Sequence, residues 1–233
     1  MKLIKRIIFL LIVAIIIVGS VFVYKGKKMY DEAVAETSLK DTVERIQNDE
    51  DFVKFDDLPR DYLNAVVAVE DHRYRKHGAI DIIAIGRAIW INVTNFQLLE
   101  GGSTITQQVA KNIFFIEKDD AASRKIAEIF AAIDLEKNYS KDDILTLYAN
   151  TIYFGDGYYG IKEACRGYLG IEPSKMTLYD CTMMAGIPNA PSVYAPTVNP
   201  DLTRDRQKKV ISDMVEYGYL SQESADKLLN KSI

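Results

Sequence analysis

The chain has 233 residues, of which 48% are hydrophobic and 27% charged, a composition typical of a folded domain with or without an appendage. Residues 1–28 hold six basic residues and no acid, so the remaining 23 basic and 33 acidic residues carry a net charge of −10, which excludes non-specific binding to the phosphates of DNA or RNA. Cys165 and Cys181 form no C-x-x-C motif and only two histidines are present, which argues against a structural zinc site or a disulfide scaffold and leaves their pairing open.

The first predicted element is an uncharged run of eighteen residues at 7–24, IIFLLIVAIIIVGSVFVY, bracketed by lysines. As a helix rising ~1.5 Å per residue it would span ~27 Å, close to the ~30 Å hydrocarbon core of a bilayer. A signal peptide is the alternative, but its apolar region is usually ~7–15 residues long and ends at a small-x-small site, which VFVYKGKK lacks. We therefore expect a retained anchor within residues 1–28. Three basic residues lie on each side, so only the α-amine favours a cytoplasmic N-terminus.

Residues 29–55 are acidic, contain no Gly or Pro, and are loosely patterned for a helix, which predicts a stalk or a membrane-proximal helix. Helical periodicity dominates residues 56–233, the predicted main domain. Its expected helices span residues 59–70, 80–93, 103–114, 122–137, 141–151, 159–168, 176–186, 202–217 and 222–230. Capping boxes are expected for three pairs: Thr104 with Gln107, Ser140 with Asp143, and Thr177 with Asp180.

The first candidate site is the pair Glu70-Asp71, which ends an apolar helix and precedes the run HRYRKHGAID. A carboxylate at the point where a helix leaves the core is partly desolvated, and desolvation raises its pKa toward the range of a general base. Spacing alone favours the alternative, an exposed acid paired with Arg73 or Arg75. His77 either belongs to the same site or is a helix-end residue that interacts with the helix dipole.

The second candidate is the run GGSTITQQVAKN. Its glycines let the backbone approach a ligand, while Ser103, Thr104 and the free amides of a helix N-terminus suit an anion. Gln107, Gln108 and Lys111 follow on successive turns. An ordinary capped helix is the alternative, although packing does not readily explain so long a polar run.

The third candidate, SRKIAE, opens a helix at residues 123–128. Arg124 and Glu128 are four residues apart on one face, so an exposed ion pair worth ~0.3–0.5 kcal/mol is the simpler interpretation. A fourth segment, NTIYFGDGYYGIKEACRGYLG, places five aromatic residues around glycines. Such aromatic residues stack on sugars in some proteins and more often belong to the core.

Together, and in this order, the four segments resemble the peptidoglycan glycosyltransferases of family 51, the transglycosylase domains of class A penicillin-binding proteins and their monofunctional relatives. EDHRYRKHG resembles E-D-x-x-F-x-x-H-x-G, with Tyr74 in place of Phe, and residues 101–112 match G-G-S-T-I-T-Q-Q-x-x-K-N in full. Arg124, Lys125 and Glu128 match R-K-x-x-E. The runs KDDILTLYANTIYFGDGYYGI and AGIPNAPSVYAPTVNP are also similar to the family.

This resemblance implies a mostly α-helical, lysozyme-like, two-lobed domain behind the transmembrane helix, with a cleft beside the membrane. It implies lipid II as substrate, β-1,4 glycan as product with inversion at the anomeric carbon, and undecaprenyl diphosphate as leaving group. The catalytic residues would be Glu70, as general base, and Glu128, which would hold the neighbouring basic side chains or a divalent ion, Mg²⁺ or Mn²⁺. No organic cofactor is expected. The implied substrate-binding residues are Asp71, His77, Ser103, Thr104, Gln107, Lys111, Arg124 and Lys125.

The chain also departs from the family's pattern. EKDDAAS stands where a further Arg is usual; Lys118 is the candidate replacement, but Asp119 and Asp120 have the wrong sign for a diphosphate. Thr146 and Ala149 replace Glu and Leu. SADK near the C-terminus matches S-x-x-K, but no S-x-N or K-T-G occurs, so we expect no transpeptidase domain.

The implied location is the bacterial cell membrane, with a single pass and an extracytoplasmic catalytic domain. The implied partners are lipid II, the growing glycan chain, membrane lipid and other cell-wall synthesis proteins, and no nucleic acid. Two alternatives are a lytic glycan hydrolase on the same scaffold and a catalytically weak scaffold that binds lipid II. The cations at residues 103–128 favour the transferase, because a hydrolase has no pyrophosphate leaving group.

Overall fold

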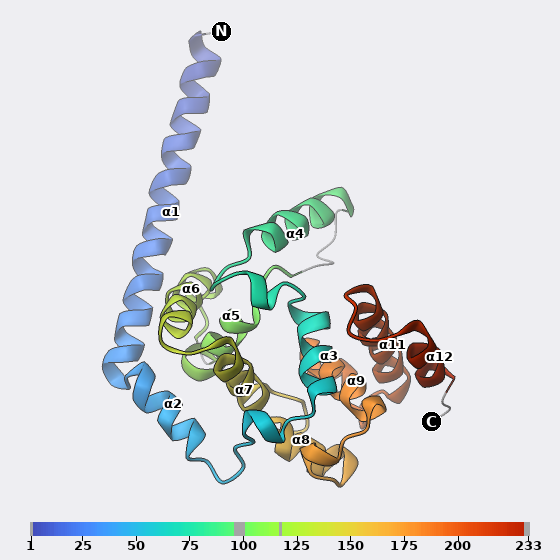
Figure 1. Ribbon diagram of the computed structural model, residues 1–233. Helices are drawn as coiled ribbons and strands as arrows, with labels where there is room; N and C mark the ends of the chain where they lie inside the picture. The colour runs from blue at the N-terminus through green and yellow to red at the C-terminus, as the bar shows by residue number, and fades with distance from the viewer. Residues whose placement is uncertain (1, 96–100, 117, 231–233) are drawn as a thin grey trace.

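The computed structural model describes residues 2–95, 101–116 and 118–230 (Figure 1). Every regular element within these residues is helical, and an isolated antiparallel bridge joins Tyr153 to Tyr159. The predicted mostly α-helical fold with an apolar N-terminal helix is therefore confirmed.

The helices follow the predicted order. The α-helices are α1 (Lys2–Glu36), α2 (Leu39–Gln47), α3 (Arg60–Glu70), α4 (Ile82–Asn95), α5 (Ile105–Ala110), α6 (Ala121–Asn138), α7 (Lys141–Thr151), α8 (Ile161–Leu169), α9 (Leu178–Gly186), α10 (Pro191–Tyr194), α11 (Pro200–Glu216) and α12 (Gln222–Leu229). Short 3₁₀ turns lie at Phe55–Asp57, Tyr74–Lys76, Pro173–Lys175 and Ile187–Asn189. The helix predicted at 103–114 divides into α5 and a π-helical turn, Lys111–Phe115. The other predicted helices of the main domain end within two residues of the observed ones.

All three predicted capping boxes form. At α5 the Thr104 hydroxyl accepts from the backbone N–H of Gln107 at 3.2 Å, and the Gln107 side chain accepts from the backbone N–H of Thr104 at 3.3 Å. The same reciprocal pairs begin α7 and α9. Each box satisfies two amides that a helix N-terminus otherwise leaves unpaired, and an N-cap of this kind is worth ~1 kcal/mol.

The first helix, α1, is long and apolar enough to cross a membrane, and its apolar part projects away from the rest of the protein (Figure 1). Its later turns pack along α6. Gly26 lies in this contact and is buried, and a Cβ there would lie 2.5 Å from the Cβ of Ile126. One turn on, the Tyr30 hydroxyl donates to Asp134 of α6. Only glycine permits this close approach of the two helices.

The segment 29–55, predicted to be a stalk or a membrane-proximal helix, is helical over most of its length and packs on the main domain. It contains the end of α1 and the whole of α2, and the boundary predicted after residue 28 falls inside an unbroken helix. Tyr30, Val43 and Val53 are buried in the main core. The acidic residues of α2 are exposed, so the composition of this segment describes its outer face and not its packing.

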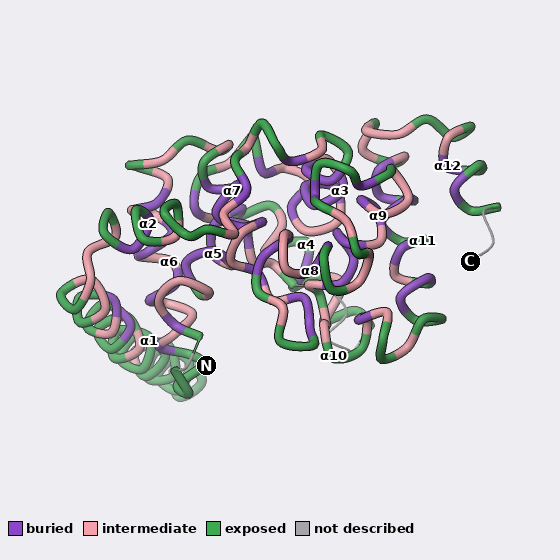
Figure 2. The backbone as a smooth tube through the Cα atoms, turned by 90° about the horizontal axis from the view of Figure 1, so that it is seen from below, coloured by how far each residue is buried: buried purple, intermediate pink, exposed green. Residues whose placement is uncertain are grey.

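The central helix of the main domain is α3, in which Tyr62, Ala65 and Val66 are fully buried among neighbouring side chains. It packs against α9 and α11, while α5 packs against α6 and α7 (Figure 2, buried residues in purple). Cys165 and Cys181 are both free and buried, and burial raises the pKa of each thiol to about 12. Both thiols are therefore protonated and unreactive at neutral pH.

An exposed apolar surface lies on α4, of whose residues only Ala88 is buried. Five of its large apolar side chains are at least 60% exposed: Ile82, Ile83, Ile89, Trp90 and Val93. In Figure 1, α4 lies on the side of the main domain toward which the apolar part of α1 projects. A patch of this kind indicates contact with a partner or a membrane.

Candidate active site

A cleft of about 1110 Å³ opens where the C-terminal end of α3 meets α5, α6 and α11. Seven of the sequence-predicted site residues line it: Glu70, Asp71, Ser103, Lys111, Arg124, Lys125 and Glu128. The helix α11 adds a wall that carries Arg206, Lys209 and Asp213. The fold thus brings together segments that are far apart in the sequence.

Glu70 is the last residue of α3, and its side chain is only 8% exposed. Its Oε2 accepts a hydrogen bond from Gln108 Nε2 at 2.8 Å. The guanidinium of Arg206 lies 3.6 Å from Oε1, too far for a hydrogen bond. Oε1 is buried and has no hydrogen-bond partner among the described residues. One oxygen of Glu70 is therefore held by a hydrogen bond, while the other has none among the described residues.

Burial raises the pKa of Glu70, and this effect outweighs the hydrogen bond from Gln108 and the charge of Arg206, which both lower it. A carboxylate with a raised pKa is a better general base than an exposed one. The alternative of an exposed acid paired with Arg73 or Arg75 is wrong, because those arginines form ion pairs with Asp81 and Asp142.

A second group of charges lies at the start of α6. Lys125 Nζ donates to Ser103 Oγ at 2.7 Å and to Glu128 Oε2 at 2.8 Å, and Arg124 Nε lies 3.5 Å from Glu128 Oε1. Glu128 is only 3% exposed, so the simpler interpretation of an exposed Arg124–Glu128 pair is wrong. The buried carboxylate holds two cations at a helix N-terminus, whose dipole also favours an anion.

A third cation, Lys111, begins the π-helical turn that follows α5. It is exposed and lines the cleft. Asn112, beside it, also lines the cleft, and its side-chain nitrogen is buried without a partner among the described residues. Wide turns of this kind occur frequently at functional sites. The turn thus places an amide donor and a cation side by side.

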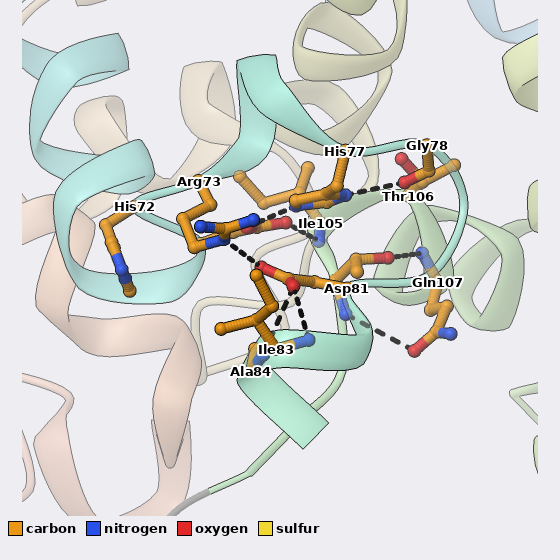
Figure 3. A network of polar contacts seen from close by, with 12 residues as sticks. His72, Arg73, His77, Gly78, Asp81, Ile83, Ala84, Ile105, Thr106 and Gln107 are labelled. Atoms are coloured by element: carbon orange, nitrogen blue, oxygen red, sulfur yellow. Dashed lines mark hydrogen bonds and ion pairs between the residues drawn. The ribbon is translucent and has the colours of Figure 1, made fainter. Parts of the chain in front are cut away.

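A polar network fixes the loop after α3 (Figure 3). His77 Nε2 lies 2.7 Å from Asp71 Oδ1, and Nδ1 lies 2.6 Å from the next backbone carbonyl oxygen. Asp71 Oδ2 accepts from the backbone N–H of Ile105 at 3.1 Å, which joins the end of α3 to the start of α5. Arg73 pairs with Asp81 at 2.9 Å, and Asp81 accepts from the first amides of α4.

The Asp71–His77 pair predicts a loss of stability at alkaline pH. Burial lowers the pKa of His77, but the hydrogen bonds to Asp71 and to the backbone carbonyl outweigh it, so the pKa is raised above its usual ~6.5. The contribution of this pair to the free energy of unfolding is therefore complete below pH ~6.5. It is lost as the pH rises through the folded-state pKa of His77, and the free energy of unfolding falls by at most ~1.4 kcal/mol per pH unit. Urea unfolding of the detergent-solubilised chain from pH 6 to 9 measures it.

In that experiment His77→Gln is expected to lower the free energy of unfolding by about 1–3 kcal/mol at pH 6 and to flatten its decline above pH 6.5. The matched control is His72→Gln, since His72 is stacked on Tyr217 and has no hydrogen bond to Asp71. Equal slopes for wild type and His77→Gln would contradict this assignment.

Three predicted substrate-binding residues, Thr104, Gln107 and His77, are not among the residues that line the cleft. Thr104 and Gln107 are 2% exposed and are held by their own capping box, and His77 is held by Asp71. Gln108, one residue further, is the glutamine that lines the cleft. In the sequence, the place of Gln108 just after the Thr104–Gln107 capping box could have indicated that its side chain is available to the cleft. Nothing in the sequence pattern indicated Arg206.

Comparison with known proteins identifies the family. The transglycosylase family profile matches residues 37–215, well over half of the chain. The chain belongs to the transglycosylase family. Within that family, it is 40% identical over 186 residues to a protein of Cupriavidus necator whose name describes a predicted transglycosylase, and the match covers 80% of each chain.

Other relatives of the transglycosylase family are much longer. Penicillin-binding protein 1F of Bacillus subtilis is 40% identical over 173 residues, which cover 74% of this chain and 24% of that protein. Penicillin-binding protein 1A of Neisseria lactamica is 38% identical over 183 residues, which cover 78% of this chain and 23% of that protein. This chain thus matches about a quarter of each penicillin-binding protein. A crystal structure of penicillin-binding protein 1A from Haemophilus influenzae aligns with a TM-score of 0.47 and 22% identity, over 78% of this chain and 17% of that one.

The departures from the transglycosylase pattern have local explanations. Asp120 is the N-cap of α6, where it accepts from the backbone and hydroxyl of Ser123. The Arg124 guanidinium donates to the backbone carbonyl of Lys118 at 2.7 Å, so this loop holds a cation of the cleft. Thr146 is buried in α7, donates to the carbonyl of Asp142, and does not line the cleft. The presence of Thr146 where the family usually has Glu therefore does not change a residue that lines the cleft.

The described residues do not fit a divalent ion at Glu128. Each of its oxygens already faces a basic side chain, Lys125 or Arg124. Three other groups, Asp71, His77 and Asp81, lie close enough together to ligate a metal ion. Both ring nitrogens of His77 are, however, engaged by hydrogen bonds, and neither is free as a ligand. No step of the reaction is therefore assigned to a metal at these residues.

Proposed function

We propose that this protein polymerises lipid II into β-1,4 glycan strands, with inversion at the anomeric carbon and release of undecaprenyl diphosphate. The observation that carries the proposal is one cleft lined by both a buried carboxylate with an unpaired oxygen, Glu70, and the cations Lys111, Arg124 and Lys125. A polymerase needs both parts, a base for the attacking hydroxyl and cations for the leaving group.

Glu70 acts as the general base. Its Oε1 takes the proton from the 4-hydroxyl of the acceptor. At the same time the oxygen of this hydroxyl attacks the anomeric carbon of the growing chain. Gln108 holds the other oxygen of Glu70, which fixes the direction of the free one. The charge of Arg206, 3.6 Å away, lowers the pKa of Glu70 and so favours the charged carboxylate against the effect of burial.

The leaving group is a lipid diphosphate, so negative charge develops on its phosphate oxygens as the glycosidic bond breaks. Arg124 and Lys125 are fixed by Glu128, and Lys111 lies in the same cleft. Cations held in place before the reaction stabilise the developing charge without reorganisation. An α-linked donor and a β-linked product require a single inverting displacement, and hence no covalent glycosyl-enzyme.

The membrane supplies the lipid substrate. The apolar helix α1 supports a single-pass anchor, with the main domain on the extracytoplasmic side where lipid II is used. The exposed apolar side chains of α4 support a second contact with membrane lipid. Other cell-wall synthesis proteins are further partners in this proposal.

The test is polymerisation of purified lipid II by the detergent-solubilised full-length chain, with and without Mg²⁺ or Mn²⁺. Glycan ladders on a gel are the expected result. Shortening of preformed glycan without ladders would identify a hydrolase. Binding of lipid II by a folded chain without any turnover would identify a scaffold.

A further inference from the structure

The contact between α1 and α6 lies directly behind the cations of the cleft. The residues of α6 that meet α1 recur every three or four positions, so they share one side of the helix: Ser123, Ile126, Phe130 and Asp134. Phe130 is stacked on Tyr30 of α1, with 6.3 Å between the ring centroids, and Asp134 accepts a hydrogen bond from the Tyr30 hydroxyl. This side of α6 is therefore fastened to α1.

Another side of the same helix faces the cleft. Arg124, Lys125 and Glu128 line the cleft, and Lys125 Nζ lies between Ser103 Oγ at 2.7 Å and Glu128 Oε2 at 2.8 Å. The Arg124 guanidinium donates to the carbonyl of Lys118. These contacts hold the charged ends of the two side chains. The backbone from which both side chains extend is held from behind, by α1.

Gly26 of α1 makes this contact with the backbone of α6. A Cβ atom at position 26 would lie 2.7 Å from the carbonyl oxygen of Ser123, and 2.5 and 2.6 Å from Cβ and Cγ2 of Ile126. Non-bonded carbon atoms pack at about 3.5–4.0 Å, so a side chain here would separate the two helices by roughly 1 Å. The Ser123 carbonyl belongs to the peptide bond that leads into Arg124, and Lys125 follows. Such a displacement therefore moves the origin of both cations.

We infer that Gly26 is a positioning residue for the anion site of the cleft. Through its contact with the first turns of α6, α1 sets where Arg124 and Lys125 meet a diphosphate. Gly26 acts through the backbone of α6 and touches no substrate itself. The identity of the anion, a lipid diphosphate leaving group, rests on the proposed function. The helix α1 is then part of the framework of the site as well as an apolar anchor.

The test uses inorganic pyrophosphate as the probe, because its binding needs no turnover. Isothermal titration calorimetry on the detergent-solubilised full-length chain measures its dissociation constant, and weaker binding to Lys125→Met shows that the probe occupies the cleft. Gly26→Ala is expected to raise the dissociation constant about tenfold, as loss of one charge-assisted contact does. Gly19→Ala, the matched control on the same helix, is expected to leave it unchanged, since a Cβ at Gly19 would meet no described atom within 4 Å.

Tyr30→Phe separates positioning from stability. It removes the hydrogen bond to Asp134 from the same interface but adds no atom beside the first turns of α6. We therefore expect a lower Tm and an unchanged dissociation constant for pyrophosphate. In polymerisation of lipid II, Gly26→Ala is expected to lower kcat by up to ~10²-fold, the cost of a displacement near 1 Å, while Tyr30→Phe leaves kcat unchanged.

A second variant applies if Gly26→Ala does not fold. Gly26→Ala combined with Ile126→Ala removes the Cγ2 atom from the steric conflict but keeps the conflict with the Ser123 carbonyl oxygen, so the same loss of affinity is expected.

The inference is overturned if the folded variant binds pyrophosphate as tightly as the wild type does. It is also overturned if Tyr30→Phe weakens binding to the same extent, because the interface then serves only the fold, or if the wild type binds no pyrophosphate. If Gly26→Ala weakens pyrophosphate binding but the wild type forms no glycan, the proposed function fails and the positioning role stands.

Discussion

Glu70→Gln is expected to abolish glycan polymerisation while the chain stays folded and still binds lipid II. Glutamine keeps the shape of the side chain and an oxygen that accepts from Gln108, but it cannot take a proton from the acceptor hydroxyl. Loss of a general base typically costs ~10²–10⁴ in rate. Glycan ladders formed from labelled lipid II, followed over hours, cover that range.

The control for this variant is Glu223→Gln. Glu223 is an exposed glutamate of α12 that forms a surface pair with Lys227, remote from the cleft, so its exchange should leave the rate of polymerisation unchanged. Lipid II binding and the circular dichroism spectrum are compared for both variants. Polymerisation by Glu70→Gln at more than a tenth of the wild-type rate would exclude Glu70 as the base.

Lys125→Met is expected to give the second largest effect, a fall in kcat of about 10²–10³, as for the loss of one preorganised charge at a leaving group. The same change removes the shortest contact of the buried Glu128 carboxylate, so it is also expected to lower the free energy of unfolding by about 1–3 kcal/mol. Single-turnover polymerisation and urea unfolding measure the two effects separately.

The double variant Lys125→Met with Glu128→Gln separates catalysis from stability. Replacing both charges removes the uncompensated carboxylate, so stability is expected to return toward the wild-type value while kcat stays low. Lys137→Met, an exposed lysine on the same helix, is the control for loss of a positive charge. Recovery of kcat together with stability in the double variant would mean that Lys125 serves only the fold.

Local sequence was sufficient to predict most of the helices and their caps, because both depend on residues a few positions apart. Thr104 and Gln107 illustrate the limit. The same two residues were predicted both to cap a helix and to bind substrate, although a side chain held in a capping box is not available to a ligand. Gln108, which the box leaves free, reaches Glu70.

Long-range packing could not be read from the sequence in the same way. Arg206 meets Glu70 only because α11 packs across α3, and its local sequence, RDRQKK, looks like an exposed charged helix face. Likewise, the acidic residues of 29–55 suggested a stalk or a membrane-proximal helix, whereas Tyr30 and Val43 at the inner face pack this segment into the main core. Composition averages over both faces of a helix, and the buried face determines where it lies.

The close contact of Gly26 with α6 has a mechanical consequence for a membrane-anchored protein. Because α1 is unbroken from its apolar part to this contact, the main domain is joined to the apolar part by a continuous helix and not by a flexible linker. The main domain therefore has no hinge between the apolar part of α1 and Gly26 about which it could swing. The cleft is therefore carried at a set orientation relative to the apolar part of α1.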